Sequence, residues 1–199
     1  MEVKLDKRYP LEVSLEQAWA VLSDIRATAG CMPGAVITEQ LDATHYKGTV
    51  KSKVGPAVMS FGGDVEVLGL DAAAHSLQLL AKGADKAGSS AAMNLIAHLE
   101  PGATPTSAVL VGVATVTVSG KLAQFGSRLL VPVSDAMLGQ FADNFRAAAA
   151  AVPAAGASKS EVAAAAAAQA AAPVRELNAL ALMWTVLKGW LAGLFGKRG

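Results

Sequence analysis

The side chains that most often carry out chemistry in proteins are scarce in this chain and are not grouped. The three histidines, His45, His75 and His98, stand far apart, and none has cysteine or carboxylate neighbours at the spacing of metal ligands. The lone Cys31 has no histidine or basic residue close to it in the sequence that would activate its thiol as a nucleophile. We therefore expect no metal site and no catalytic residues, and we interpret the protein as a binding protein rather than an enzyme.

The remaining polar candidates fall where a predicted strand faces solvent. His45 shares a strand face with lysines, and His98 alternates with apolar neighbours. Asp64 and Glu66 likewise occupy the polar face of their predicted strand. The glycines at 62–63 lie inside that strand and not between a strand and a helix, so they do not form a phosphate-binding loop. They predict a β-bulge that curls the sheet.

Length and composition predict one domain with an appendage. The chain has 199 residues and a formal net charge of +1, so no overall field attracts nucleic acid. Its aromatic residues make up 5% of the chain and do not alternate with arginine as they do on nucleic-acid-binding surfaces. The first residues, Met1–Asp6, lack the apolar core of a signal peptide, which predicts a cytoplasmic body.

Residues 1–148 carry the periodicities of an α+β domain. A strand is predicted over residues 3–11, and Ser14 with Gln17 forms a capping box that opens a helix. A short second helix is predicted over residues 24–29. Both helices are short, so strands must supply most of the domain.

Alternation of apolar and polar residues predicts a series of antiparallel strands. From Tyr46 on, one face of the chain is apolar or small, and the other is rich in lysine. The alternation recurs in later segments at residues 59–67, 77–81, 93–99 and 108–119. A long helix from Lys121 to Ala151 is predicted to close the domain, and Pro132 is expected to kink it or to mark a later start.

Beyond this domain the sequence changes character twice. Residues 149–173 are mostly alanine and offer no large apolar side chain for a core, which predicts a flexible linker. Residues 174–199 place large apolar side chains at helical spacing, which predicts an amphipathic helix that binds a membrane. The predicted membrane-binding residues are Leu180, Met183, Trp184, Leu187, Trp190, Leu191, Leu194 and Phe195.

The mode of that membrane contact has three alternatives. A spanning helix needs about 20 apolar residues, and Lys188 near the bilayer centre costs about 2.5 to 3.5 kcal/mol. Because Gly189 and Gly193 also weaken the helix, a helix lying in the interface is favoured over one that spans. The third alternative is a helix that folds back on the domain or pairs through Gly189 and Gly193.

Four short strings give the domain a family resemblance. They are Cys31–Gly34, Lys53–Pro56, Phe61–Val67 and Val118–Ala123. In this order they resemble the carbon monoxide dehydrogenase CoxG-like family of the START/polyketide-cyclase-like (SRPBCC) superfamily, and the resemblance covers about residues 1–148. It implies a helix-grip fold, in which a curved antiparallel sheet wraps around a long C-terminal helix and leaves an elongated apolar cavity. It also implies a protein that works beside carbon monoxide dehydrogenase.

The inward apolar residues either line that cavity or simply fill a core. A cavity is favoured because methionine adapts to flexible ligands and because several strand positions supply too little volume for close packing. Those small positions are Gly48, Gly63, Ala81, Ala97 and Gly112. The predicted lining residues are Met32, Pro33, Tyr46, Met59, Phe61, Met93, Leu95, Phe125, Leu129, Met137 and Phe141.

A membrane-tethered apolar cavity without catalytic residues predicts a carrier of a lipid-soluble molecule. Beside a dehydrogenase whose electrons enter the quinone pool, we expect that molecule to be a quinone, menaquinone in particular, with the Tyr46 hydroxyl orienting its head group. The expected partners are carbon monoxide dehydrogenase, membrane lipid and the quinone pool, at the cytoplasmic face of the cell membrane. No nucleic acid and no metal are expected.

Two alternatives to the carrier remain. One is an adaptor that recruits the dehydrogenase to the membrane through Lys47, Lys51 and Lys53 and binds no ligand. The other is an enzyme of the cyclase type, which the apolar inward positions disfavour because it needs an acid and a base inside the cavity.

Overall fold

A computed structural model describes residues 1–54 and 57–153. Its elements, in chain order, are β1 (Glu2–Leu11), α1 (Leu15–Leu22), α2 (Ile25–Cys31), β2 (Ala35–Gln40), β3 (His45–Val54), β4 (Ala57–Asp71), β5 (Ser76–Asp85), β6 (Ser90–Pro101), β7 (Ala108–Ser119), the 3₁₀ helix η1 (Gly120–Phe125) and α3 (Gly126–Ala150). The predicted membrane-binding helix and almost all of the predicted linker lie outside the described residues.

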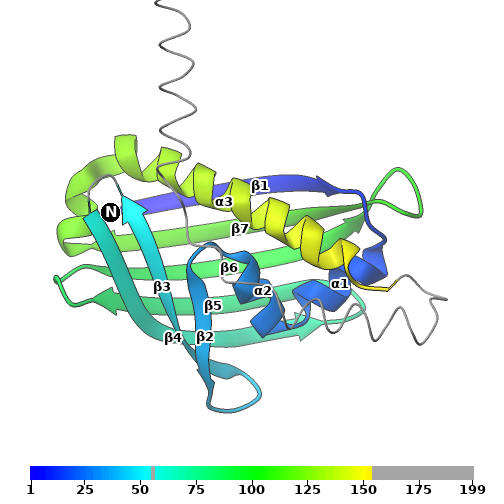
Figure 1. Ribbon diagram of the computed structural model, residues 1–199, viewed down its shortest axis with the longest axis horizontal. Coiled ribbons are helices and arrows are strands. Elements are labelled where there is room, and N and C mark those ends of the chain that lie inside the picture. The colour runs from blue at the N-terminus through cyan, green and yellow to red at the C-terminus, as the bar shows by residue number, and fades with distance from the viewer. Residues whose placement is uncertain (55–56, 154–199) are drawn as a thin grey trace, which may run out of the picture.

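The strands form one antiparallel sheet that curves around the long helix. Its seven strands are ordered β1-β7-β6-β5-β4-β3-β2, so each strand pairs with its neighbour in sequence except β1, which joins the sheet beside β7. Figure 1 shows α3 lying across the concave side, with α1 and α2 at its C-terminal end. The predicted helix-grip fold is confirmed.

The two short helices begin as their capping residues predict. Ser14 Oγ accepts a hydrogen bond from the Gln17 backbone N–H at 3.2 Å, and the Gln17 side chain accepts one from the Ser14 N–H at 3.1 Å. The Asp24 carboxylate accepts the backbone N–H groups of Arg26 and Ala27 at the start of α2. This helix ends at Cys31, two residues later than predicted.

The last helix starts later than its periodicity predicts and ends inside the core. Residues 120–125 form η1 instead of α-helix, and α3 continues through Pro132 in its second turn. At the other end, α3 runs through Ala150, past the predicted start of the linker at residue 149. Ala149 is fully buried, and Gln17 donates a side-chain hydrogen bond to the Val152 carbonyl at 2.6 Å.

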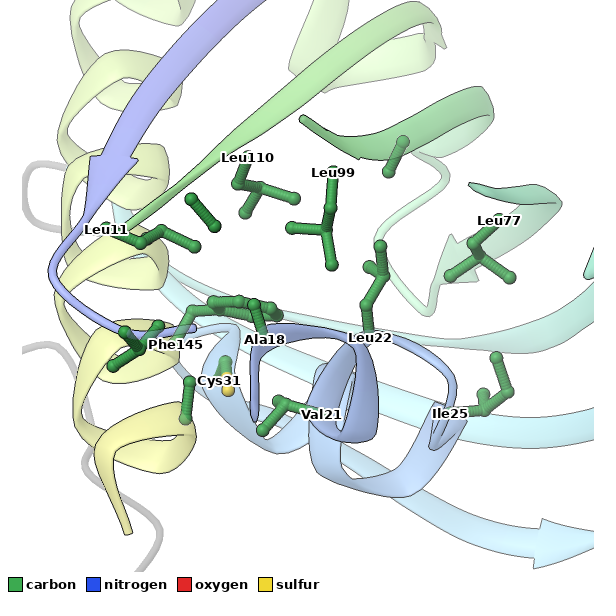
Figure 2. Packing of buried hydrophobic residues seen from close by; sticks show 14 of the residues in the cluster. Leu11, Ala18, Val21, Leu22, Ile25, Cys31, Leu77, Leu99, Leu110 and Phe145 are labelled. Atoms are coloured by element: carbon green, nitrogen blue, oxygen red, sulfur yellow. The ribbon is translucent and has the colours of Figure 1, made fainter. Parts of the chain in front are cut away.

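Two groups of buried side chains fill the interior. The main cluster lies between the sheet, α1 and the C-terminal half of α3, and Figure 2 shows Leu22 and Phe145 meeting the strand residues there. Phe145 and Leu77 are completely buried. A second, smaller cluster at the other end of the molecule contains Met59, Val118, Leu122 and Leu130.

The predicted bulge at residues 62–63 is wrong, because pairing of β4 is regular there. The register shift lies further along β4, between Val67 and Gly69. Position 63 requires glycine for a different reason, which is the close approach of β5. A Cβ atom on Gly63 would lie 1.9 Å from the Lys82 carbonyl oxygen and 2.6 Å from the Gly83 Cα, so no other residue fits without a backbone shift.

This close approach predicts different effects for two adjacent glycines. Gly63→Ala must push β4 and β5 apart, and we expect the free energy of unfolding to fall by about 1–3 kcal/mol. The matched control is Gly62→Ala, since a Cβ there meets nothing within 4 Å. It should leave stability unchanged or slightly raised, within about 1 kcal/mol. Urea unfolding of both variants makes the comparison, and equal stabilities would contradict the close approach.

Candidate ligand-binding cavity

The concave side of the sheet contains an apolar cavity of about 220 Å³. It lies between α2 and the half of the sheet formed by β2 to β6. The lining residues are Ala29, Ala35, Val36, Ile37, Gly48, Thr49, Val50, Phe61, Gly62, Gly63, Asp64, Val65, Ala81, Lys82, Gly83, Ala91 and Met93.

The cavity is hollow because a row of paired positions carries no side chain. Gly48 on β3 pairs with Gly63 on β4, which in turn pairs with Gly83 on β5, and all three line the cavity. We call these three residues the glycine row. It continues on β6 with Ala91, a residue with a single methyl group. Four adjacent strands thus contribute almost no side-chain volume at the same level of the sheet, and close packing fails there.

Next to the glycine row, a second set of paired residues forms the wall of the cavity. Val65, Ala81 and Met93 are partners across β4, β5 and β6, and all three line the cavity. Ala81 is the small member between two larger ones. A larger side chain at position 81 would therefore project into the cavity.

Of the predicted lining residues, Phe61 and Met93 line this cavity. Leu95 and Phe141 are half-buried against the main cluster, where the Phe141 ring lies 5.8 Å from that of Phe145. Met59 belongs to the second cluster. Two of the small positions expected to leave space do not line the cavity either. Ala97 is buried in the main cluster, and Gly112 faces the Leu95 side chain.

The predicted residues on the last helical segments lie apart from the cavity. Phe125 and Leu129 are 40% and 39% exposed, and Met137 is half-buried with its sulfur 4.0 Å from the Ser52 hydroxyl. Within the described part of the chain, η1 and α3 contribute no lining residue. The helix α3 packs mainly on α1, α2, η1 and β1, and it reaches β3 at Met137 and Ser52, outside the cavity lining.

Tyr46 is buried, but its hydroxyl has local partners. It donates a hydrogen bond to the Ala43 carbonyl at 3.2 Å and accepts one from the Gln40 side chain at 3.4 Å. Both partners belong to β2 or to the turn before β3. The structure thus uses this hydroxyl to hold the turn and places it away from the cavity lining.

Polar groups around the cavity do not require a polar ligand. The lining residues with polar side chains are Thr49, Asp64 and Lys82, and the last two are exposed partners across β4 and β5. Among the described residues, no buried side-chain nitrogen or oxygen atom lacks a hydrogen-bond partner. A ligand in this cavity would therefore be held mainly by apolar contact.

The turn after α2 joins the lining residues Ala29 and Ala35, but its own residues, the predicted Met32 and Pro33 among them, do not line the cavity. It is held in place from α3 and β3. The Asn144 side chain donates a hydrogen bond to the Cys31 carbonyl at 2.9 Å, and the Lys51 N–H donates one to the Gly34 carbonyl at 2.9 Å. Met32 in this turn is half-buried, and Pro33 is buried. The Cys31 thiol itself is buried, and this burial raises its pKa to about 11, so it stays protonated at neutral pH.

The histidines lie outside the cavity, each with its own partners. Hydrogen bonding to Asp42 raises the pKa of His45, and the Thr44 backbone N–H together with the His45 ring lowers the pKa of Asp42. His98 bonds the Glu100 carboxylate at 3.2 Å on the outer face, as its strand position predicts. The His75 ring lies edge-on to Trp19 with centroids 5.4 Å apart.

Two further features bear on the predicted functions. Within residues 1–54 and 57–153, no group of three or more histidine, cysteine or carboxylate side chains is placed to hold a metal ion. None of the helices in the same ranges combines the length and the hydropathy that crossing a bilayer requires.

Solved structures share this fold at low sequence identity. A conserved protein from Geobacillus kaustophilus superposes with a TM-score of 0.68 at 18% identity, covering 75% of this chain and 97% of its own. The ZhuI aromatase/cyclase from Streptomyces sp. R1128 follows with 0.58 at 13% identity, covering 79% and 100%. A START superfamily protein from Mycobacterium smegmatis gives 0.53 at 13%, covering 75% and 99%. At these identities the likeness shows the fold alone.

Sequence comparison identifies the family. No curated protein matches the chain. The profile of the carbon monoxide dehydrogenase CoxG family matches residues 11–150, which is well over half of the chain and includes every residue that lines the cavity. The chain therefore belongs to the CoxG family of carbon monoxide dehydrogenase proteins, as its sequence strings predict, and has the helix-grip fold of START-like proteins.

Proposed function

We propose that this protein is a membrane-associated carrier that holds a lipid-soluble quinone, menaquinone in particular, in its apolar cavity and passes it between the membrane and carbon monoxide dehydrogenase. The observation that carries the proposal is the hollow at the glycine row, in a member of a family described as a subunit of that dehydrogenase. The protein acts by binding its ligand and not by catalysis.

The size of the cavity fits part of such a ligand. At about 220 Å³ it is smaller than the roughly 300–1,000 Å³ of sites that enclose a whole drug-sized molecule. A long isoprenoid quinone would place one portion in the cavity and leave the rest outside. Each CH₂ group that is buried contributes about 0.8 kcal/mol, so affinity rises with the number of isoprenoid carbons that the cavity encloses and needs no polar anchor.

The lining explains why the carrier would not react with its ligand. Reduction of a quinone to a hydroquinone takes up two electrons and two protons, and the lining side chains offer no redox group to supply the electrons. Both electrons must come from the partner enzyme. The carrier then needs only to bind the oxidised and reduced forms and to protect the apolar portion from water.

The direct test is to ask what the protein carries. We expect organic extraction of the full chain, purified from its membrane fraction without delipidating detergent, to yield a quinone that mass spectrometry identifies. A preparation without quinone that also fails to bind added menaquinone after reconstitution would rule out the carrier and leave the adaptor.

A variant that fills the cavity separates the carrier from the adaptor. Ala81→Phe projects a ring between Val65 and Met93, and displacing two or more buried CH₂ groups should lower quinone affinity by about tenfold or more. The matched control, Ala84→Phe, lies on the exposed face of the same strand and should bind quinone normally.

The readouts are bound quinone, recruitment of the dehydrogenase to membranes, and electron transfer to the quinone pool. A carrier loses quinone and electron transfer in Ala81→Phe but keeps recruitment. If the protein is an adaptor, both variants recruit the dehydrogenase and support electron transfer as well as the unchanged protein does. Circular dichroism and urea unfolding of both variants confirm that the fold persists.

A further inference from the structure

Large apolar side chains are exposed where η1 passes into α3. Phe125, Leu129 and Val131 are 40%, 39% and 39% exposed, and all three fall within seven consecutive residues. We call them the apolar rim. Phe125 and Leu129 lie about one helical turn apart, and Val131 lies on the other side of the exposed face of α3. Exposed apolar residues are ordinary on a protein surface, so the significance of this group depends on what surrounds it.

The apolar rim is connected to the cavity through buried apolar side chains. Its neighbours in sequence, Leu122 and Leu130, belong to the second cluster. Phe61 and Ala91 pack against that cluster, and both also line the cavity. An uninterrupted series of apolar contacts therefore runs from the cavity to this end of the molecule.

Three basic side chains flank the apolar rim. Lys121 and Arg128 are exposed on the same segment, and Lys86 is exposed in the turn between β5 and β6. That turn is fixed against η1, because the buried Ser89 hydroxyl accepts the Leu122 backbone N–H at 3.1 Å. We call Lys86, Lys121 and Arg128 the basic flank.

Acidic groups near the basic flank are few and engaged elsewhere. Residues 120–134 contain no aspartate or glutamate, and Asp135 forms an ion pair with Lys7 at 2.9 Å. The Asp85 carboxylate accepts backbone N–H groups within its own turn. Within the described part of the chain, the ion pairs do not include any member of the basic flank. This end is therefore both apolar and positively charged.

We propose that the apolar rim and the basic flank dock this end of the domain onto an anionic phospholipid bilayer. Apolar side chains enter the acyl boundary while lysine and arginine meet the lipid phosphates, which is the pattern of interfacial membrane binding. A second copy of the chain fits less well, because a symmetric contact would bring like charges together. The inference deepens the proposed function, since it assigns the face through which a lipid-soluble ligand enters.

The test places an environment-sensitive fluorophore on Ser127→Cys in the full chain. Ser127 is exposed one helical turn before Val131, and the native Cys31 is buried and protonated, so labelling is selective. The matched control is Ala73→Cys in the turn between β4 and β5, which lies at the opposite end of the long axis in Figure 1. The probe surface is a vesicle of phosphatidylcholine with phosphatidylglycerol.

We expect the label at 127 to brighten and shift to shorter wavelength with these vesicles, and the label at 73 to stay unchanged. If the fluorescence of the label at 127 does not change, the proposal is overturned, whether or not the chain sediments with the vesicles. A response that appears only when the dehydrogenase is added overturns it in favour of a protein partner. The response of the label needs no quinone. Docking can therefore fail in this test while quinone binding succeeds, and quinone binding can fail while docking succeeds.

Charge reversal tests the basic flank separately. Since each basic residue near an anionic surface contributes about fivefold in affinity, Lys121→Glu with Arg128→Glu should weaken vesicle binding about 20-fold or more and abolish the label signal. The control reverses Arg26 and Lys47, which are exposed elsewhere and give the same change in net charge. Equal losses in both double variants would show a nonspecific charge effect and contradict the docking face.

Discussion

The cavity depends on a single constraint, which is that three neighbouring strands bring glycine to the same level of the sheet. Gly48, Gly63 and Gly83 are consecutive partners across β3, β4 and β5. At the middle position the backbone of β5 comes so close that a side chain is excluded. A concave sheet surface without side chains leaves a volume that α2 covers but does not fill.

A register shift elsewhere makes this alignment possible. The bulge between Val67 and Gly69 adds one residue to β4 between the glycine row and the turn that leads to β5. With regular pairing from Asp71 and Ser76 onward, Gly63 would pair with Ala84, and the side chains of β4 from Phe61 to Val67 would turn to the other face of the sheet. The bulge is thus part of the site, although it lies outside the cavity.

Sequence patterns could predict the elements and the family but not this alignment. Alternation predicts six of the seven strands and misses β2, the pair Ser14 and Gln17 predicts the first helix, and Gly48, Gly63 and Ala81 stand out as too small to fill a core. Gly83 was missed, because its role depends on a pairing that is set by turn lengths and the bulge. The lining expected from α3 also depended on tertiary structure: periodicity shows that a helix is amphipathic, but not which part of the sheet it covers.

The division of the interior into two clusters has a consequence for exchange of a ligand. Phe145 and Ala149 fix the C-terminal half of α3 in the main cluster, whereas its N-terminal half rests on the smaller second cluster and leaves Leu129 half-exposed. Local opening requires least free energy where the fewest apolar contacts are broken, so the end of the domain near the rim is the one that can loosen. For the proposed carrier this matters, because each CH₂ group of the enclosed portion gains about as much in the cavity as in the bilayer. Exchange of that portion needs a low barrier more than a tight site, and the sparsely packed end of the domain provides a low barrier where the apolar path meets the surface.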